Sequence, residues 1–194
     1  MPKKLEPLKI ACTSSDCDNG LHCFKATRKM LEKNEEGHCR SCGADLIDWD
    51  RIKKNDFGDV DYTFRVLKKE LIRHHFFHIK LDIRAINHAR RKGVVNLNIA
   101  ARHRIEKYIG PKDPPRDGRQ TPMSGNSIFY AQHAVACCCR KCIEYWHGIP
   151  QGRPLTATEI DYLSDLVEKY LGEKLPDLPQ KGEKVPSIRE KKNE

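Results

Sequence analysis

The clearest pattern of apolar and polar positions begins near residue 60. Apolar side chains recur there at intervals of three and four residues, at Val60, Phe64, Leu67, Leu71 and Ile72. This spacing places the five side chains on one face of an α-helix. We therefore expect a helix over residues 60–78, with Asp59 available as its N-cap.

Start and stop signals predict three further helices, at residues 82–92, 96–109 and 156–171. Gly93 and Gly110 stand where the first two would end, and glycine is common just beyond a helix C-terminus. Thr156 and Glu159 form a capping box, which marks the start of the third. Apolar residues of that third helix would form a buried stripe: Leu155, Ile160, Leu163, Leu166, Val167 and Tyr170.

Residues 131–147 allow two interpretations. A single helix would place one set of side chains on a shared face: His133, Cys137, Arg140, Glu144 and His147. A helix that instead begins near Cys138 would put the pair Cys139 and Cys142 at a helix N-terminus, where the helix dipole and neighbouring cations lower thiol pKa values. Residues 128–130 fit either a short strand or the entry to this helix.

The predicted fold class is mainly α, with a small zinc-ribbon-like module of loops and short β elements before a helical domain. A cluster of turn-favouring residues at 55–59 suggests a boundary near residue 56. The predicted parts are a flexible lead at 1–10, the module at 11–55, the helical domain at 56–175 with a Pro/Gly-rich loop at 110–127, and a disordered basic tail at 176–194.

Composition narrows the possible functions. The chain has 194 residues and a net charge of +9, and its apolar runs fall far short of the ~20 residues that span a bilayer. No apolar segment follows the first basic residues, so no secretory leader is expected. We therefore expect a soluble cytoplasmic protein without a membrane partner. Its nine cysteines, clustered and odd in number, are then more typical of metal ligands than of disulfides.

The first cysteine cluster lies in residues 11–46. Cys39 and Cys42 are separated by two residues and followed by glycine, a spacing typical of a zinc knuckle. His22 lies near the upstream thiols. We expect one structural Zn²⁺ bound by four of five cysteines: Cys12, Cys17, Cys23, Cys39 and Cys42.

The second cysteine cluster could hold a further Zn²⁺. Its candidate ligands are a subset of His133, Cys138, Cys139, Cys142 and His147. Three protein ligands and a water would leave an open position for metal-assisted hydrolysis. Glu144 or a residue of the row Glu70, His74, His78 and Asp82 would act as base, and Arg119 or Arg140 would bind an anionic substrate. A thiol redox sensor and simple structural packing are the alternatives.

A row of ionisable residues follows strict four-residue spacing on the first predicted helix and just beyond it. Its members are Glu70, His74, His78 and Asp82. On one helix face they could bind a divalent metal or supply a general base. They could equally form an ordinary polar face bonded to water.

The segment 84–119 is strongly basic. Eight of its cations are candidates for contact with DNA or RNA: Arg84, Arg90, Arg91, Lys92, Arg102, Arg104, Arg116 and Arg119. A solvated helical surface would explain the same charges. Together with the zinc module, the segment favours a zinc-binding protein that contacts nucleic acid, and the metal-dependent hydrolase is the alternative.

Four motifs carry a family resemblance: Arg116-Asp-Gly-Arg-Gln-Thr-Pro-Met-Ser-Gly, Ala131-Gln-His-Ala, Cys138-Cys-Arg-Lys-Cys and Trp146-His-Gly-Ile-Pro. Over roughly residues 60–172 the chain resembles an uncharacterised bacterial family known as a domain of unknown function. The resemblance implies a shared centre of Gln120, Thr121, Gln132, His133, Cys138, Cys139, Arg140, Cys142, Trp146 and His147. It also implies that Cys137, which replaces a hydroxyl residue, is dispensable and that the N-terminal module is an addition. The family brings no activity that can be transferred.

Overall fold

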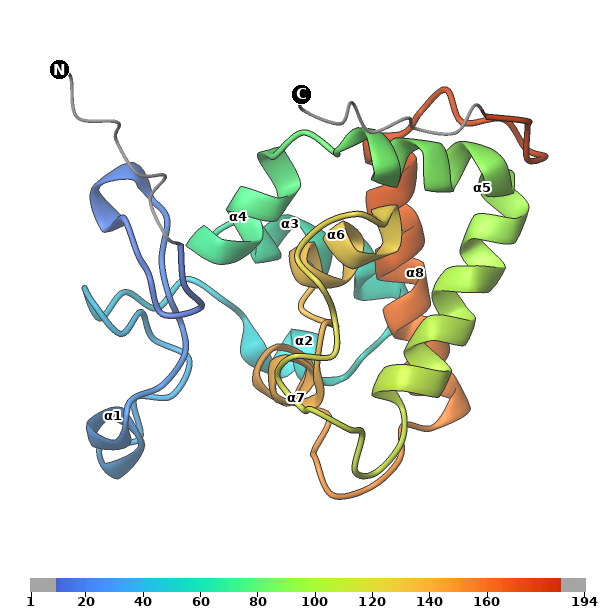
Figure 1. The fold of residues 1–194 in the computed structure, drawn as a ribbon. Coiled ribbons are helices and arrows are strands. Elements are labelled where there is room, and N and C mark those ends of the chain that lie inside the picture. Colours follow the sequence, from blue (N-terminus) through green and yellow to red (C-terminus); the bar gives the residue numbers. More distant parts are fainter. Residues whose placement is uncertain (1–9, 186–194) are drawn as a thin grey trace, which may run out of the picture.

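The computed structural model describes residues 10–185. The described part contains helices and turns but no β-strand, so the mainly α class is confirmed (Figure 1). The α-helices are α1 (Arg28–Glu32), α2 (Trp49–Lys53), α3 (Val60–Leu67), α4 (Leu71–His78), α5 (Ile83–Arg104), α6 (Ser127–Ala134), α7 (Arg140–His147) and α8 (Ala157–Lys174). Short 3-10 helices cover Cys17–Asn19 and Phe57–Asp59, and α5 ends in the π-helical turn Ile105–Ile109.

Helix α8 is the centre of the helical domain. It contacts α3, α5 and α6, and Figure 1 shows α5 and α6 on either side of it. The predicted apolar stripe of α8 is buried, and the predicted capping box of Thr156 and Glu159 is formed. Burying one large aliphatic or aromatic side chain stabilises a fold by about 1.5–3 kcal/mol, so this stripe fixes the positions of the surrounding helices.

The helix predicted over residues 60–78 is in fact two helices. Helix α3 ends at Leu67, and Glu70 adopts an extended conformation before α4 begins. The backbone there pairs with the N-terminal module instead: the amide of His22 donates to the carbonyl of Lys69, and the amide of Leu71 donates to the carbonyl of His22. A long-range parallel bridge therefore replaces one turn of helix.

Residues 131–147 follow the second of the two sequence interpretations. Residues 127–134 form α6, so residues 128–130 are helical, and α7 begins at Arg140 with Cys139 as its N-cap. The intervening residue Ala136 has a φ of 57°, in the left-handed region, which turns the chain between the two helices. This turn creates the second cysteine cluster.

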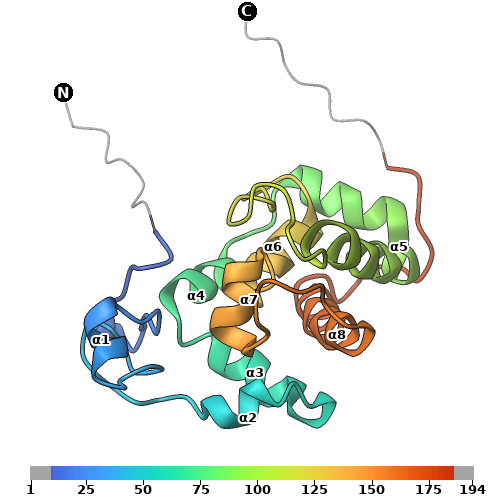
Figure 2. The same ribbon diagram turned by 90° about the horizontal axis from the view of Figure 1, so that it is seen from below.

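The predicted domain boundary at residue 56 comes after α2, and α2 packs on the helical domain. Helix α2 contacts α7, and the rings of Trp49 and Trp146 lie 5.1 Å apart. The part that stands apart from the helical domain is shorter (Figure 2). It contains the isolated bridge of Asp16 with Leu21, and the bridge of His22 with Glu70 joins it to the start of α4.

Residues 176–185, the described part of the predicted disordered tail, make backbone contacts with α5, while residues 186–194 lie outside the described part, as do residues 1–9 of the predicted lead. Gly93, where a helix end was predicted, is a kink in α5 with φ 67° and ψ 171°. The kink frees backbone groups: the amide of Val94 donates to Pro179, and the amide of Glu183 donates to Arg90. Pro- and Lys-rich composition suggested disorder, but these backbone bonds hold the segment against α5.

A Gly93→Ala variant should lose stability and release the C-terminal segment. A Cβ at residue 93 would lie 2.6 Å from the Gly182 amide nitrogen and would require an L-residue in a left-handed conformation. Such strain costs about 1–3 kcal/mol. Urea unfolding and protease cleavage within residues 176–185 measure both effects.

Gly172→Ala is the matched control, because Gly172 lies in α8 with no atom within 4 Å of the added Cβ. This variant should be neutral or up to about 1 kcal/mol more stable. Equal behaviour of the two variants would contradict the role of the kink.

Candidate metal centres

The first candidate centre lies in the N-terminal module. Its members are Cys17, His22, Cys39 and Cys42, whose ligand atoms all lie within 4.8 Å of one another. The Sγ atoms of Cys17 and Cys39 are 3.7 Å apart, and Cys42 Sγ lies 3.5 Å from His22 Nδ1. We call this set the module centre. One imidazole and three thiols match a common tetrahedral zinc set.

The turn at residues 39–43 holds two of these thiols. The Cys39 amide donates to the Ala44 carbonyl and the Gly43 amide donates to the Cys39 carbonyl, each at 2.8 Å. Gly43 has a φ of 75°, a conformation that glycine adopts without a Cβ penalty. The predicted knuckle of Cys39 and Cys42 is thus a tight turn that points both thiols at one place.

The pKa values of two thiols in the module centre are shifted in opposite directions. Burial favours the neutral thiol of Cys39, but hydrogen bonds with the backbone of Cys23, Cys42 and Ser41 outweigh it and lower the Cys39 pKa to about 6. Burial and hydrogen bonds with the neighbouring thiols raise the pKa of Cys17 to about 12. One thiolate is therefore present near neutral pH, and a metal ion would displace protons from the others.

The prediction of four cysteine ligands from the first cluster is corrected. Cys12 and Cys23 lie outside the module centre, and His22 takes the fourth place. The buried Cys23 thiol donates to the Cys12 carbonyl at 3.4 Å, so it is turned away from the other thiols. The sequence places His22 next to Cys23 but does not show which of the two side chains faces the other thiols. In the structure His22 pairs with Glu70 through its backbone, and its side chain lies next to Cys42.

The second candidate centre consists of Cys138, Cys139 and Cys142, whose Sγ atoms lie within 4.8 Å of one another. We call it the helical-domain centre. Cys139 is the N-cap of α7 and Cys142 lies in the first turn of that helix. All nine cysteines are free thiols, so neither cluster forms a disulfide in this structure.

The Pro/Gly-rich loop holds the backbone of this second cluster. Thr121 Oγ1 donates to the Cys138 carbonyl at 2.8 Å, and the Arg140 amide donates to Asp117 Oδ1. Gln132 Nε2 donates to the Cys137 carbonyl, and its Oε1 accepts from Arg104 Nε at 2.8 Å. The loop therefore positions the thiols through backbone contacts.

A buried arginine faces the helical-domain centre from α4. Arg73 is 1% exposed, and its Nη2 donates to Cys142 Sγ at 3.3 Å. Its Nε donates to Glu70 Oε2 at 3.0 Å and its Nη1 to the His133 carbonyl at 2.6 Å. Glu70 also accepts from Tyr145 Oη and Trp146 Nε1. Sequence reasoning missed Arg73, and no local signal marked it.

These contacts decide which thiol carries charge. Hydrogen bonds with Cys138 and Cys139 hold the pKa of Cys142 well below its usual value, and the Arg73 charge acts in the same direction. Hydrogen bonds with Cys139 and Cys142, together with burial, raise the pKa of Cys138. Cys142 is thus the thiolate, and Arg73 is its counter-charge.

The two histidines predicted as ligands do not join this centre. His133 Nε2 lies 3.2 Å from the Thr121 carbonyl, and His147 Nε2 lies 3.0 Å from the Val135 carbonyl. Burial lowers the pKa of both to about 4, so both imidazoles are neutral near pH 7. Cys137 is fully buried in the core and is not part of the cluster.

The side chains of the predicted catalytic pair, Arg140 and Glu144, make contacts away from the thiols. Arg140 is buried, and its Nη2 donates to the carbonyls of Pro150 and Arg153. Glu144 is exposed and accepts from the amide and side chain of Gln151. Both side chains hold the 150–153 turn, and neither contacts the thiols.

The predicted row of Glu70, His74, His78 and Asp82 does not form one of the metal groups found in residues 10–185. Glu70 is taken by Arg73. The rings of His74 and His78 stack 3.9 Å apart. Asp82 caps α5 and accepts from Tyr130 Oη, because the chain leaves the helix at Ile79.

The eight basic residues predicted to contact nucleic acid differ in whether another side chain of the fold holds them. Three are held by side chains of the chain itself: Arg90 by Glu183, Arg102 by Asp161 and Arg104 by Gln132. Within residues 10–185, no acidic side chain pairs with Arg91, Lys92, Arg116 or Arg119, and all but the half-buried Lys92 are exposed. Arg84 is also exposed and has an interaction of its own.

Residues 61–172 match the family model described as Domain of unknown function (DUF4186). The chain belongs to the DUF4186 family. No solved structure matches the chain. The DUF4186 segment contains the helical-domain centre, Arg73 and the loop that holds the thiols, whereas the module centre lies before it. None of the helices described for this DUF4186 protein has the length and apolar character needed to cross a membrane.

The purified chain should contain two metal equivalents, one for each cluster. Cys39→Ser and Cys142→Ser should each remove one equivalent, because each deletes a thiol ligand, while Cys137→Ser should retain both. Elemental analysis of protein purified without chelator measures the content. A ligand variant that keeps two equivalents would show that its cluster holds no metal.

Arg73→Met should lower the free energy of unfolding by about 3–5 kcal/mol, because it leaves the Glu70 carboxylate buried without its counter-charge. Adding Glu70→Gln should recover part of this loss. Urea unfolding of the single and double variants measures the recovery.

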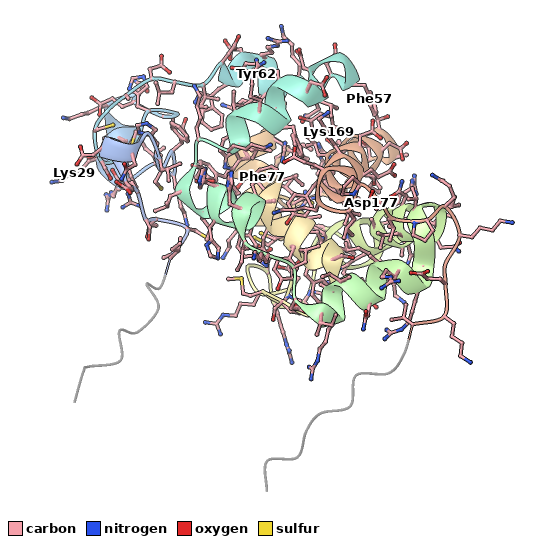
Figure 3. All side chains as sticks on the ribbon, turned by 90° about the horizontal axis from the view of Figure 1, so that it is seen from above. Lys29, Phe57, Tyr62, Phe77, Lys169 and Asp177 are labelled. Atoms are coloured by element: carbon pink, nitrogen blue, oxygen red, sulfur yellow. The ribbon has the colours of Figure 1, made fainter. Side chains whose placement is uncertain are left out.

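The matched control is Lys169→Met at the exposed pair with Asp61, where the loss should stay under about 1 kcal/mol. In Figure 3 the label of Lys169 lies between α8 and α3, the helix that carries Asp61. A double variant that is less stable than Arg73→Met would contradict the buried pair.

Proposed function

We propose that this protein is a zinc protein that binds the phosphate backbone of DNA or RNA. The observation that carries the proposal is the set of surface cations on α5 and the following loop, Arg91, Lys92, Arg116 and Arg119, which have no acidic partner among the described residues. Cations that are not neutralised within the fold remain available to phosphate.

An aromatic side chain accompanies the cations. Tyr108 is 46% exposed, and the cationic groups of Arg104 and Lys107 lie 5.1 Å and 5.6 Å from its ring centre. Exposed aromatic rings beside cations are suited to stacking on unpaired bases. This pairing supports contact with single-stranded as well as duplex nucleic acid.

The donor sets favour zinc as the metal. Thiolate and imidazole are soft to borderline ligands, which suit Zn²⁺ better than Mg²⁺ or Ca²⁺. With four protein ligands, the module centre would be closed and structural. Zinc there would stabilise the fold of the module and take no part in a reaction.

The alternative of a metal-dependent hydrolase has less support. Hydrolysis at a zinc centre needs an open coordination position and a base near the bound water. Glu144 bonds to Gln151, Glu70 is engaged by three donors, and Asp117 accepts from the Arg140 amide and from Gln120. The surface cations therefore support nucleic-acid binding better than the thiols support catalysis.

Binding to a labelled duplex and to a single-stranded oligonucleotide should weaken steeply between about 50 and 200 mM salt. Arg91→Gln/Lys92→Gln and Arg116→Gln/Arg119→Gln should each reduce the salt slope by up to about 2 on duplex DNA, because each phosphate contact contributes about 0.9. Fluorescence anisotropy at several salt concentrations measures both effects.

Lys29→Gln/Lys33→Gln is the matched control. It removes the same charge from α1, at the opposite end of the molecule from α5 (Figure 3). No binding by the wild type at the lowest salt would refute the proposal. An equal loss in the control would assign any binding to net charge alone.

A further inference from the structure

The helical-domain centre supplies three thiols, and a closed zinc site takes four ligands. The nearest other donors of α6 and α7 are already engaged: His133 lies against two backbone carbonyls and Cys137 is buried in the core. A fourth protein ligand, in place of a water, would have to come from another part of the chain. The thiols that the module centre leaves over are Cys12 and Cys23.

The module is joined to the helical domain directly beside this centre. His22 forms a parallel bridge with Glu70, and the amide of Leu71 donates to the His22 carbonyl at 3.0 Å. Glu70 holds Arg73, and Arg73 donates to Cys142 Sγ. The segment that follows Cys12 in the module is thus connected to the thiolate of the second centre through two side chains.

Cys12 is linked to this part of the module by a hydrogen bond. Its carbonyl accepts from the buried Cys23 thiol at 3.4 Å, which ties residue 12 to the strand-like segment at 22–24. Its own thiol is in an exposed residue and has no hydrogen bond among the described contacts. Burial raises the pKa of the Cys12 thiol, and the charges of Arg73, Cys142 and Glu70 also act on that pKa.

Cys23 does not fit the same role. Its thiol is fully buried and already donates to the Cys12 carbonyl. Cys12, by contrast, can rotate its exposed side chain without breaking a contact of the core. The two cysteines therefore differ in the freedom of their side chains.

We propose that Cys12 is the fourth thiolate of the helical-domain centre, so that one metal ion would join the N-terminal module to the helical domain. This inference rests on the proposal that the centre binds zinc. On binding, each protonated thiol would release its proton to solvent, and no oxidation or reduction takes place. Four thiolates around Zn²⁺ leave a net negative charge, which the buried Arg73 partly balances.

Cobalt substitution tests the ligand count in the full chain. Co²⁺ replaces Zn²⁺ in tetrahedral thiolate sites, and its sulfur-to-metal charge-transfer absorption grows with the number of thiolates bound. We compare wild type, Cys12→Ser and Cys23→Ser, each titrated to two equivalents of Co²⁺. Cys12→Ser should lose the absorption of one thiolate, and Cys23→Ser should keep the absorption of the wild type.

Zinc affinity gives a second readout. Competition with a chromogenic chelator should show that Cys12→Ser weakens one of the two Zn²⁺ sites at least about 10-fold, the lower end of what indirect partners of a metal contribute. Because Cys12 is exposed, this variant should remain folded by circular dichroism.

The outcomes separate the two proposals. If Cys142→Ser retains both metal equivalents, the helical-domain centre binds no metal and the zinc proposal for it fails. If Cys142→Ser loses one equivalent while Cys12→Ser matches wild type in absorption and affinity, only the role of Cys12 is overturned. Loss of absorption in Cys23→Ser but not in Cys12→Ser would also overturn it.

Discussion

The buried guanidinium of Arg73 is the interaction on which the rest of the structure depends. A charge that is 1% exposed is costly unless each of its donors is satisfied, and here the partners are Glu70, the His133 carbonyl and Cys142. These partners belong to the start of α4, the end of α6 and the first turn of α7. The cation thus fixes the relative positions of three helices and of the thiols between them.

The same interaction explains why the helix over residues 60–78 is interrupted. Glu70 must be extended to pair with His22, and its carboxylate must be buried to meet Arg73. The backbone of Glu70 therefore contacts a ligand of the module centre, while its side chain holds the counter-charge of the helical-domain centre. The two centres are connected through one residue, although only the second lies in the DUF4186 segment.

Local signals in the sequence predicted local structure well. The capping box at Thr156 depends on a few neighbouring residues and is formed as predicted, and Gly93 does interrupt the helical conformation, although α5 continues beyond it. The contacts made by Glu70 and His22 join residues far apart, so spacing alone assigned Glu70 to a histidine row. Composition likewise gave no sign of the backbone contacts of residues 176–185, because these bonds depend on the kink in α5. Thiol spacing found both clusters, but the choice among neighbouring ligands depended on the fold.

The thiols of the helical-domain centre are largely buried, whereas the cations without acidic partners lie on the surface. Cys138 and Cys139 are 6% and 5% exposed, and the side chains around them are engaged with backbone carbonyls or with one another. The cations without acidic partners, in contrast, lie on α5 and the next loop, where no rearrangement is needed for contact. A centre so enclosed is suited to holding the fold together, and the exposed basic surface is the part of the molecule suited to meeting a partner.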